Sequence, residues 1–285
     1  MKKIGFVDLS IDEWHANNYP RWIRESSLAD QFEIALAWEK LTLPGRMPLA
    51  EWCQKYDVGV AESLEQLIEE VDGIIVLAPS NPEVHEELAD LPLRSGKPVY
   101  VDKTFAPSLA AAKRMFDKAE AHGTPMWSSS ALRFGSEIEK AVHETMAGQP
   151  VHYVATRGGG RTYDEYAVHQ FEMMVMALGT GATRLMQVGN DASKVTIVDY
   201  PDGRRGCINQ STPYPFQFVA TYGDNQAVVI NEMGDFFPRL IEAILNFFNT
   251  REPVVPKEQT LEIMALVEAG VKALDARDQW VDLPK

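Results

Sequence analysis

The sequence has only two cysteines and no long hydrophobic run. Cys53 and Cys207 have neither metal-type spacing nor the look of a disulfide framework, so we expect no metal site and a reducing compartment. No apolar stretch approaches the ~20 residues that span a bilayer. The start of the chain carries only a short apolar run before Asp8, which predicts a first strand rather than a signal peptide. We therefore expect a cytoplasmic protein without a membrane partner.

Basic residues are also scarce. The chain has 27 Lys and Arg against 41 Asp and Glu, with a net charge of −14. A nucleic-acid or anionic-membrane surface needs a basic patch, so neither partner is expected. The 285 residues are 45% hydrophobic and 24% charged. This composition is typical of a globular protein with one large or two ordinary domains.

The first half of the chain alternates short apolar runs with amphipathic stretches. Helices are indicated by the capping-box form of Ser63–Gln66 and by the stretch from Ser108 to Gly123. Strand followed by helix, repeated, predicts parallel strands with right-handed crossovers. The expected strands are Lys3–Val7, Phe32–Trp38, Gly73–Ala78, Pro98–Val101 and Pro125–Ser128.

The pattern changes after about Ser129. Turn residues at 201–203 and 223–225 separate short strand candidates and indicate antiparallel strands. Two helices, Phe237–Asn249 and Lys257–Ala276, then close the chain. We predict an α/β protein with a doubly wound, Rossmann-type parallel sheet in residues 1–130. An α+β domain with a mainly antiparallel sheet follows in residues 131–285. The other strand candidates run to Gly158–Gly160 and over Arg184–Val188, Lys194–Tyr200, Arg204–Ser211, Phe216–Tyr222, Gln226–Ile230 and Trp280–Leu283.

In a doubly wound sheet the carboxyl ends of the strands meet at one edge, where ligands bind. Four groups lie at or just after the end of a predicted strand: Asp8, the stretch Ala78–Asn81, the pair Asp102-Lys103 and Ser128–Ser130. We therefore expect them to converge. Taken alone, Lys103 is better explained as an exposed charge in a solvated turn than as a binding or catalytic group.

Four segments, in order, resemble the glucose–fructose oxidoreductase and inositol dehydrogenase family, Gfo/Idh/MocA. The first is the strand followed by Pro79-Ser80-Asn81 and His85. The second is PVYVDKTF, in which Lys103 stands in the family's Glu-Lys-Pro signature between Asp102 and Thr104. The third is EYAVHQFE, with acids and a histidine at family-like spacing. The fourth is the closing pair of helices with the Val-x-Leu-Pro strand.

The resemblance implies hydride transfer between NAD or NADP and a secondary alcohol or carbonyl of a sugar-like or cyclitol substrate. It implies Lys103, His169 and Glu165 as catalytic residues, although a helical histidine can equally be a satisfied interior residue. Substrate binding is expected from Arg133, Arg161 and Glu172. The implied cofactor-binding residues are Asp8, Ser10, Glu39, Ala78, Pro79, Ser80, Asn81, His85, Asp102 and Lys103.

The turn after the first strand departs from the family. Its three glycine positions hold Asp8, Ser10 and Glu13, with Asp12 beside them. Side chains obstruct the close approach that glycine permits, and carboxylates repel a diphosphate. Glu39 is placed to bond the adenosine ribose and so favour NAD over NADP, or it is a solvated strand end.

Three hypotheses follow from these residues. The first is an NAD(P)-dependent oxidoreductase with an atypical phosphate loop. The second is a cofactor-free relative that binds a ligand or regulates a partner. The third is a lyase or glycosidase that uses transient oxidation. We further expect a homodimer or homotetramer through the antiparallel sheet, whose apolar rows include Val195, Ile197, Phe216, Phe218, Val228 and Ile230.

Overall fold

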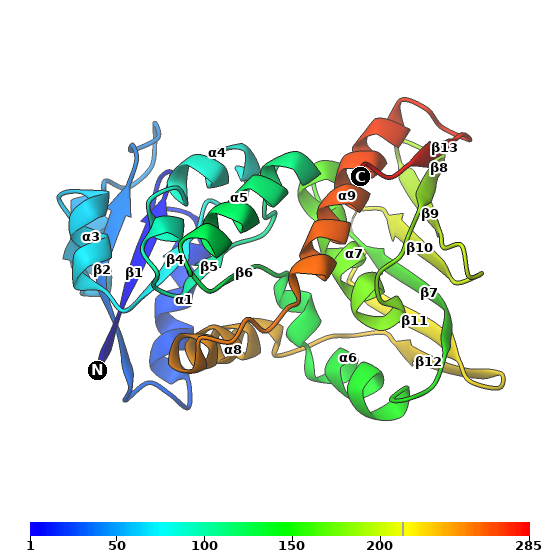
Figure 1. The fold of residues 1–285 in the computed structure, drawn as a ribbon, viewed down its shortest axis with the longest axis horizontal. Helices are drawn as coiled ribbons and strands as arrows, with labels where there is room; N and C mark the ends of the chain where they lie inside the picture. The colour runs from blue at the N-terminus through cyan, green and yellow to red at the C-terminus, as the bar shows by residue number, and fades with distance from the viewer. Residues whose placement is uncertain (213) are drawn as a thin grey trace. The chain divides into compact units, whose positions relative to one another are not determined.

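A computed structural model describes residues 1–212 and 214–285 (Figure 1). The chain divides into two compact units. The first comprises residues 1–129 and 238–257, and the second comprises residues 130–237 and 258–285. The predicted domains, residues 1–130 and 131–285, stay a prediction. Residues 238–257, expected in the second domain, lie with the first unit.

The first unit is built on a six-stranded parallel sheet in the order β3-β2-β1-β4-β5-β6. This is the strand order of a dinucleotide-binding doubly wound fold. The strands are β1 (Lys2–Asp8), β2 (Phe32–Glu39), β3 (Gly59–Val60), β4 (Gly73–Val76), β5 (Val99–Val101) and β6 (Met126–Trp127). The two-residue strand β3 was not anticipated, because so short a segment has no periodicity.

The crossovers of this sheet are helical. Ser63 and Ser108 cap α3 and α5 as predicted, accepting the backbone N–H groups of Gln66 and Ala111. The helices are α1 (Trp14–Glu25), α2 (Leu49–Tyr56), α3 (Leu64–Glu70), α4 (Pro82–Leu88) and α5 (Leu109–Ala121), with a short 3-10 turn at Pro92–Arg94. Strands β4 and β5 are buried over their whole length, as expected for a sheet covered on both faces.

Helix α8 (Phe236–Thr250) completes the core of the first unit. The ring of Phe247 meets Trp127 edge-on with centroids 6.0 Å apart, and Phe248 lies 6.4 Å from Phe32. Gly73, at the start of β4, lies against the ring of Phe248. The sequence around α8 is strongly amphipathic, but nothing local to it indicates which of two cores its apolar face enters.

The second unit contains a seven-stranded sheet in the order β12-β11-β7-β10-β9-β8-β13. All neighbours are antiparallel except β7 and β10, which are parallel, so β7 interrupts the expected meander. These two sheets confirm the predicted fold class. The strands are β7 (Val151–Gly158), β8 (Arg184–Asn190), β9 (Ser193–Asp199), β10 (Arg205–Gln210), β11 (Gln217–Tyr222), β12 (Gln226–Ile230) and β13 (Trp280–Asp282).

Helix α7 (Tyr163–Leu178) packs against β7 and β10, and the ring of Tyr163 at its start contacts α9 (Lys257–Leu274) at Gly270. Gly270 of α9 permits this second contact, since a β-carbon there would come within 2.4 Å of the Tyr163 hydroxyl oxygen. The remaining helical segments of this unit are Ala131–Phe134, α6 (Ser136–Lys140) and the turn Ala141–Thr145. Among residues 1–212 and 214–285, no helix is long and apolar enough to cross a membrane.

Replacing Gly73 by alanine should test the assignment of α8 to the first core. The new β-carbon would lie 2.8 Å from the Phe248 ring, and overpacking of this kind typically costs about 1–3 kcal/mol. Chemical denaturation of Gly73→Ala, Phe248→Leu and the double variant should give a coupling of at least ~0.5 kcal/mol, because the smaller side chain relieves the clash. Additive effects would contradict this packing.

Candidate functional site

The ends of β1, β4 and β5 lie side by side at the carboxyl edge of the parallel sheet. Leu77 N donates to Val7 O at 2.8 Å, and Asp102 N donates to Val76 O at 2.9 Å. The loops that follow these strands are therefore adjacent, as the sequence predicted. They bring Asp8, the stretch Ala78–Asn81 and the pair Asp102-Lys103 to one place.

Lys103 is held inside this edge rather than extended into solvent. Its side chain follows β5, its Nζ donates to the carbonyl oxygen of Pro79 at 3.0 Å, and the residue is only 9% exposed. The expectation of an exposed strand-end lysine is wrong, because the loop after β4 folds over it. An ammonium held in this way is preorganised, and its replacement will also affect folding.

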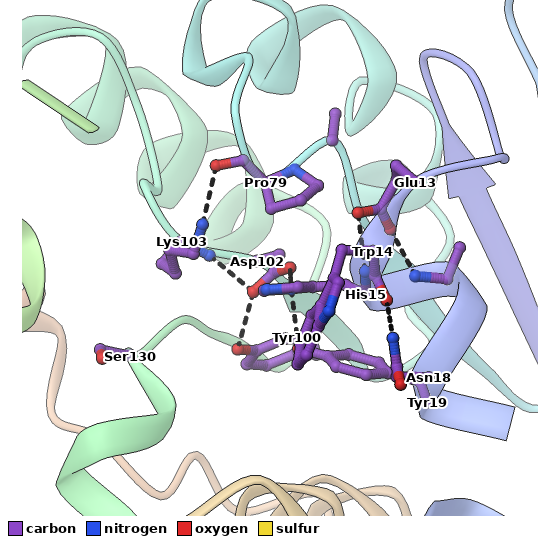
Figure 2. Close-up of polar contacts among 12 residues, drawn as sticks. Glu13, Trp14, His15, Asn18, Tyr19, Pro79, Tyr100, Asp102, Lys103 and Ser130 are labelled. Atoms are coloured by element: carbon purple, nitrogen blue, oxygen red, sulfur yellow. Dashed lines mark hydrogen bonds and ion pairs between the residues drawn. The ribbon is translucent and has the colours of Figure 1, made fainter. Parts of the chain in front are cut away.

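Asp102 lies beside Lys103 and is completely buried. Figure 2 shows its carboxylate surrounded by donors from two elements. His15 Nδ1 of α1 contacts Oδ2, while Oδ1 accepts the Lys103 N–H at 2.9 Å and faces the Tyr100 hydroxyl at 3.4 Å. The hydroxyl of Tyr19 lies 3.1 Å from His15 Nδ1, and the two rings stack.

This arrangement keeps Asp102 ionised. Burial by itself would raise the pKa of its carboxyl group, but the positive charge and hydrogen bond of His15, with the nearby charge of Lys103, outweigh burial and lower the pKa below its usual value. Removing one partner of a buried pair usually costs about 3–5 kcal/mol. Moving α1 away from the strand end would therefore leave the buried charge of Asp102 without its His15 partner.

The loop after β1 holds a carboxylate where the family has glycine. Glu13 precedes α1, and its two carboxylate oxygens accept the backbone N–H groups of His15, at 2.7 Å, and of Ala16. Burial raises the pKa of Glu13, an effect partly offset by the charge of His15 and by these N–H groups. Glu13 thus occupies the positive end of the helix dipole with its own side chain.

Asp8, at the end of β1, is 1% exposed. Its Oδ1 accepts the Ser10 N–H at 3.2 Å. Its Oδ2 has no hydrogen-bond partner within residues 1–212 and 214–285. Burial raises the pKa of Asp8 well above its usual value, and the charge of Glu13 raises it further. The carboxyl groups of Asp8, Glu13 and Asp102 thus lie at the same edge of the sheet in three different environments.

Ser10 and Glu39 hold the loop in place. Ser10 Oγ accepts the Leu43 N–H at 3.2 Å. Glu39 Oε2 accepts the Ile11 N–H at 2.9 Å, and Oε1 accepts that of Leu49 at 3.3 Å. The Glu39 carboxylate therefore joins the loop after β1 to the start of α2. In this position Glu39 is held by backbone N–H groups rather than standing as a solvated strand end, and its contact with a ribose hydroxyl stays a prediction.

His85 has a comparable role on the neighbouring loop. Its Nε2 lies 3.1 Å from Ala78 O and its Nδ1 lies 3.0 Å from Phe105 O. The ring is fully buried, and burial lowers the pKa of His85. It fastens the turn Ala78–Asn81, where Ala78 has a left-handed φ of +66°. Because both ring nitrogens face backbone carbonyl oxygens, His85 acts on a cofactor site by holding this turn in position.

In the second unit, His169 projects from α7 beside a serine. His169 Nδ1 and Ser130 Oγ are 2.6 Å apart, and the rings of Tyr166 and Phe216 flank the imidazole. Glu165, expected to orient this ring, accepts a hydrogen bond at 2.7 Å from Arg161, which lies four residues before it. A hydroxyl group thus contacts one ring nitrogen of His169, and the orienting role of Glu165 stays a prediction.

Arg133 and Glu172, both predicted to bind substrate, form a buried ion pair in this unit. Arg133 Nε donates to Glu172 Oε2 at 2.8 Å, while another of its nitrogens donates to Gln259 at 2.8 Å. The two side chains are 9% and 4% exposed. Glu172 Oε1 also accepts the Ser130 N–H at 3.2 Å. This pair fixes the segment that carries Ser130.

Sequence reasoning missed several members of these clusters. Glu13 was recognised only as a repulsive charge, yet an acid directly before a helix is a helix-capping signal. His15 and Tyr19 lie four residues apart on α1, which places them on one face. Tyr100, two residues before Asp102, was not anticipated as its partner. Ser130 was expected at the carboxyl edge of the sheet, but its contact with His169 was not anticipated.

A dinucleotide bound at this edge requires free N–H groups and space for its diphosphate in the loop after β1. In doubly wound domains the diphosphate lies on the N–H groups of the first helix, with glycines permitting its approach. Here Glu13 engages two of those N–H groups, and no glycine lies between Asp8 and Glu13. As it stands, the loop does not fit a diphosphate.

The pKa of Asp8 gives a test of this environment. Because its folded pKa is raised, the stability that Asp8 contributes is complete below the ordinary carboxyl pKa of about 4 and is lost as the pH rises through the folded value. Asp8→Asn should therefore raise the free energy of unfolding at pH 8 but not at pH 4. Each pKa unit is worth about 1.4 kcal/mol, within reach of denaturant titration.

Asp12→Asn in the same loop is the matched control. The hydrogen bonds of Asn17 and of the Met47 N–H lower the pKa of Asp12. Its ionised form therefore stabilises the fold above the ordinary pKa, and its replacement should lower stability at pH 8. A loss of stability at pH 8 in Asp8→Asn would show that the Asp8 charge is needed.

One part of the chain matches a known protein family. Residues 28–129 match the model of Gfo/Idh/MocA, described as an oxidoreductase family with an NAD-binding Rossmann fold. The match includes Pro79, Asp102 and Lys103 and begins after the loop that contains Glu13. A search of curated proteins finds no significant match.

Solved structures extend the likeness to the whole chain. A probable dehydrogenase from Thermotoga maritima is 16% identical, with a TM-score of 0.77 and 98% of each chain covered. The myo-inositol 2-dehydrogenase from Lactobacillus plantarum is 12% identical, with a TM-score of 0.79 and 99% of each chain covered. GenD2 from gentamicin A biosynthesis, solved with NAD, is 14% identical, with a TM-score of 0.79 over 100% of this chain and 97% of its own. Residues 28–129 thus match the Gfo/Idh/MocA oxidoreductase family model, and throughout its length the chain has the fold of these solved structures.

Proposed function

We propose that the protein is a cytoplasmic oxidoreductase that transfers a hydride between NAD or NADP and a secondary alcohol or carbonyl of a sugar-like or cyclitol molecule. The observation that carries this proposal is Lys103. It lies in the segment that matches an NAD-binding oxidoreductase family, at the carboxyl edge where doubly wound sheets bind ligands. The names of the similar structures, myo-inositol 2-dehydrogenase among them, support this substrate class.

In the proposed reaction Lys103 stabilises negative charge. Its ammonium is held by the carbonyl oxygen of Pro79, and a fixed cation beside the reacting oxygen lowers the energy of an alkoxide-like transition state. Asp102 fixes the backbone of Lys103 through the N–H that it accepts. Lys103 is thus the catalytic group and Asp102 its positioning residue.

His169 is proposed as the acid–base group. Histidine exchanges protons near neutral pH, and the contact with Ser130 fixes the orientation of its ring. Arg161 and Glu165 are proposed to shape the substrate side of α7 through their ion pair. Arg133 and Glu172 support this region from within the unit.

The proposal predicts that the purified protein binds a reduced nicotinamide cofactor. Titration with NADH and with NADPH, followed by nicotinamide fluorescence, should give a saturable response. Oxidation of myo-inositol and a panel of sugars with NAD⁺ or NADP⁺ should then produce absorbance from the reduced cofactor. Lys103→Met should lower kcat/KM on the active substrate by at least ~10²-fold, the usual effect of losing one transition-state donor.

Two exposed residues provide controls for this experiment. Lys113→Met on α5 and His143→Ala after α6 remove the same side chains from exposed positions and should leave kcat/KM unchanged. His169→Ala should lower kcat/KM and alter its pH profile. Full turnover in Lys103→Met would exclude the proposed role of Lys103. No response to either cofactor would favour the cofactor-free, ligand-binding relative.

The sheet of the second unit supports assembly into a homodimer or homotetramer. The strand register places one apolar row across all seven strands, formed by Val229, Val219, Ala155, Cys207, Ile197, Met186 and Trp280. Each of these residues is at least partly exposed in the single chain. Phe218 and Ile230, expected on this face, are buried on the opposite one, because neighbouring residues in a strand alternate between faces.

A continuous apolar row of this kind is typical of an association surface. Light scattering at tens of micromolar should therefore give an oligomer, and Ile197→Glu should shift it towards the monomer by burying a charge. Val271→Glu adds the same charge at an exposed position of α9 and should leave the mass unchanged. A monomeric parent protein would contradict this assembly.

A further inference from the structure

The first turn of α1 already has an anionic partner. The leading N–H groups of a helix have no partner within the helix, and its N-terminus carries partial positive charge. At α1 the carboxylate of Glu13 accepts the N–H groups of His15 and Ala16. A carboxylate with two oxygens on these groups reproduces the contact that a phosphate would make.

The rest of the loop is fixed. The Ile11 N–H is bound by Glu39, Ser10 Oγ accepts the Leu43 N–H, and Asp12 Oδ2 accepts the Met47 N–H at 2.9 Å. The Arg46 guanidinium adds a bond at 2.6 Å to the Asp12 carbonyl oxygen. The backbone is anchored at each of these positions, whereas the Glu13 side chain is held by the N–H groups of His15 and Ala16.

Asp8 provides a second, independent observation at the same place. Its buried Oδ2 has no hydrogen-bond partner in the described part of the chain, and its carboxyl group is close enough for the charge of Glu13 to raise its pKa. A buried polar atom without a partner is rare in folded proteins. It leaves this strand end open to a hydrogen-bond donor from outside the chain, a role that the diphosphate itself does not fill.

We propose that Glu13 is an internal occupant of the diphosphate position, and that a dinucleotide binds this domain only when the Glu13 carboxylate leaves the N–H groups of His15 and Ala16. The inference rests on the proposed function for the identity of the incoming ligand. Glu13 and a diphosphate then compete for the same donors, and their like charges exclude simultaneous binding. The residue at the third glycine position therefore sets cofactor affinity.

The experiment compares two probes on four proteins. NADH and inorganic pyrophosphate are titrated by isothermal calorimetry into the parent protein, Glu13→Gln, Glu13→Ala and Glu51→Gln. Glu51, an exposed acid in the first turn of α2, is the control for a change of net charge. Glu13→Ala should bind both probes at least ~10-fold more tightly than the parent, which corresponds to about 1.4 kcal/mol. Glu13→Gln should lie between them, and Glu51→Gln should match the parent.

Thermal unfolding followed by circular dichroism reports whether the loss of the cap unfolds α1. Should Glu13→Ala be unfolded, Glu13→Gln decides the test, because its amide oxygen still accepts one N–H group while the charge is gone. Equal affinities of the parent and the Glu13 variants for both probes, including no binding at all, overturn the inference. If the parent binds NADH as tightly as the variants do, the proposed function stands and the inference fails. Gain of pyrophosphate binding without NADH binding supports the inference and contradicts the proposed cofactor.

Discussion

The carboxylate of Asp102 is a full charge buried at the carboxyl end of β5, and the polar structure of this edge depends on keeping it there. His15 from α1 contacts it, Tyr100 faces it from the same strand, and the Lys103 backbone donates to it. Because His15 lies in the first turn of α1, the Asp102 charge fixes that helix against the strand end. The same turn begins at Glu13, so the charge of Asp102 and the cap of α1 form one connected arrangement.

Much of the fold could be predicted because the signals are local. The run Gly73–Val76 is apolar throughout, and Ser108 stands directly before its helix. Helix α8 shows where such reasoning ends. Its amphipathic pattern predicts a helix, but Phe248 packs over Gly73, 175 residues earlier in the chain, and only the tertiary structure brings them together. The place of β7 between β10 and β11 is non-local in the same way.

In the candidate site, too, local features could be predicted from the sequence and non-local contacts could not. The position of Lys103 followed from strand order, whereas its burial depends on the turn at Pro79 and could not be read from PVYVDKTF alone. Asp8 and Glu13 were predicted to disfavour a diphosphate. The structure adds a physical distinction between them. Glu13 satisfies backbone donors, while Asp8 is buried with one oxygen unsatisfied. Two acids five residues apart thus meet different environments because only one of them precedes a helix.

The most direct test of this account is a crystal structure of the protein grown with NADH. The account predicts that diphosphate oxygens accept the N–H groups of His15 and Ala16, with the Glu13 side chain turned away and Lys103 beside the nicotinamide end. NADH bound with the Glu13 carboxylate still on those N–H groups would contradict the account, because the diphosphate would then be held elsewhere on the domain.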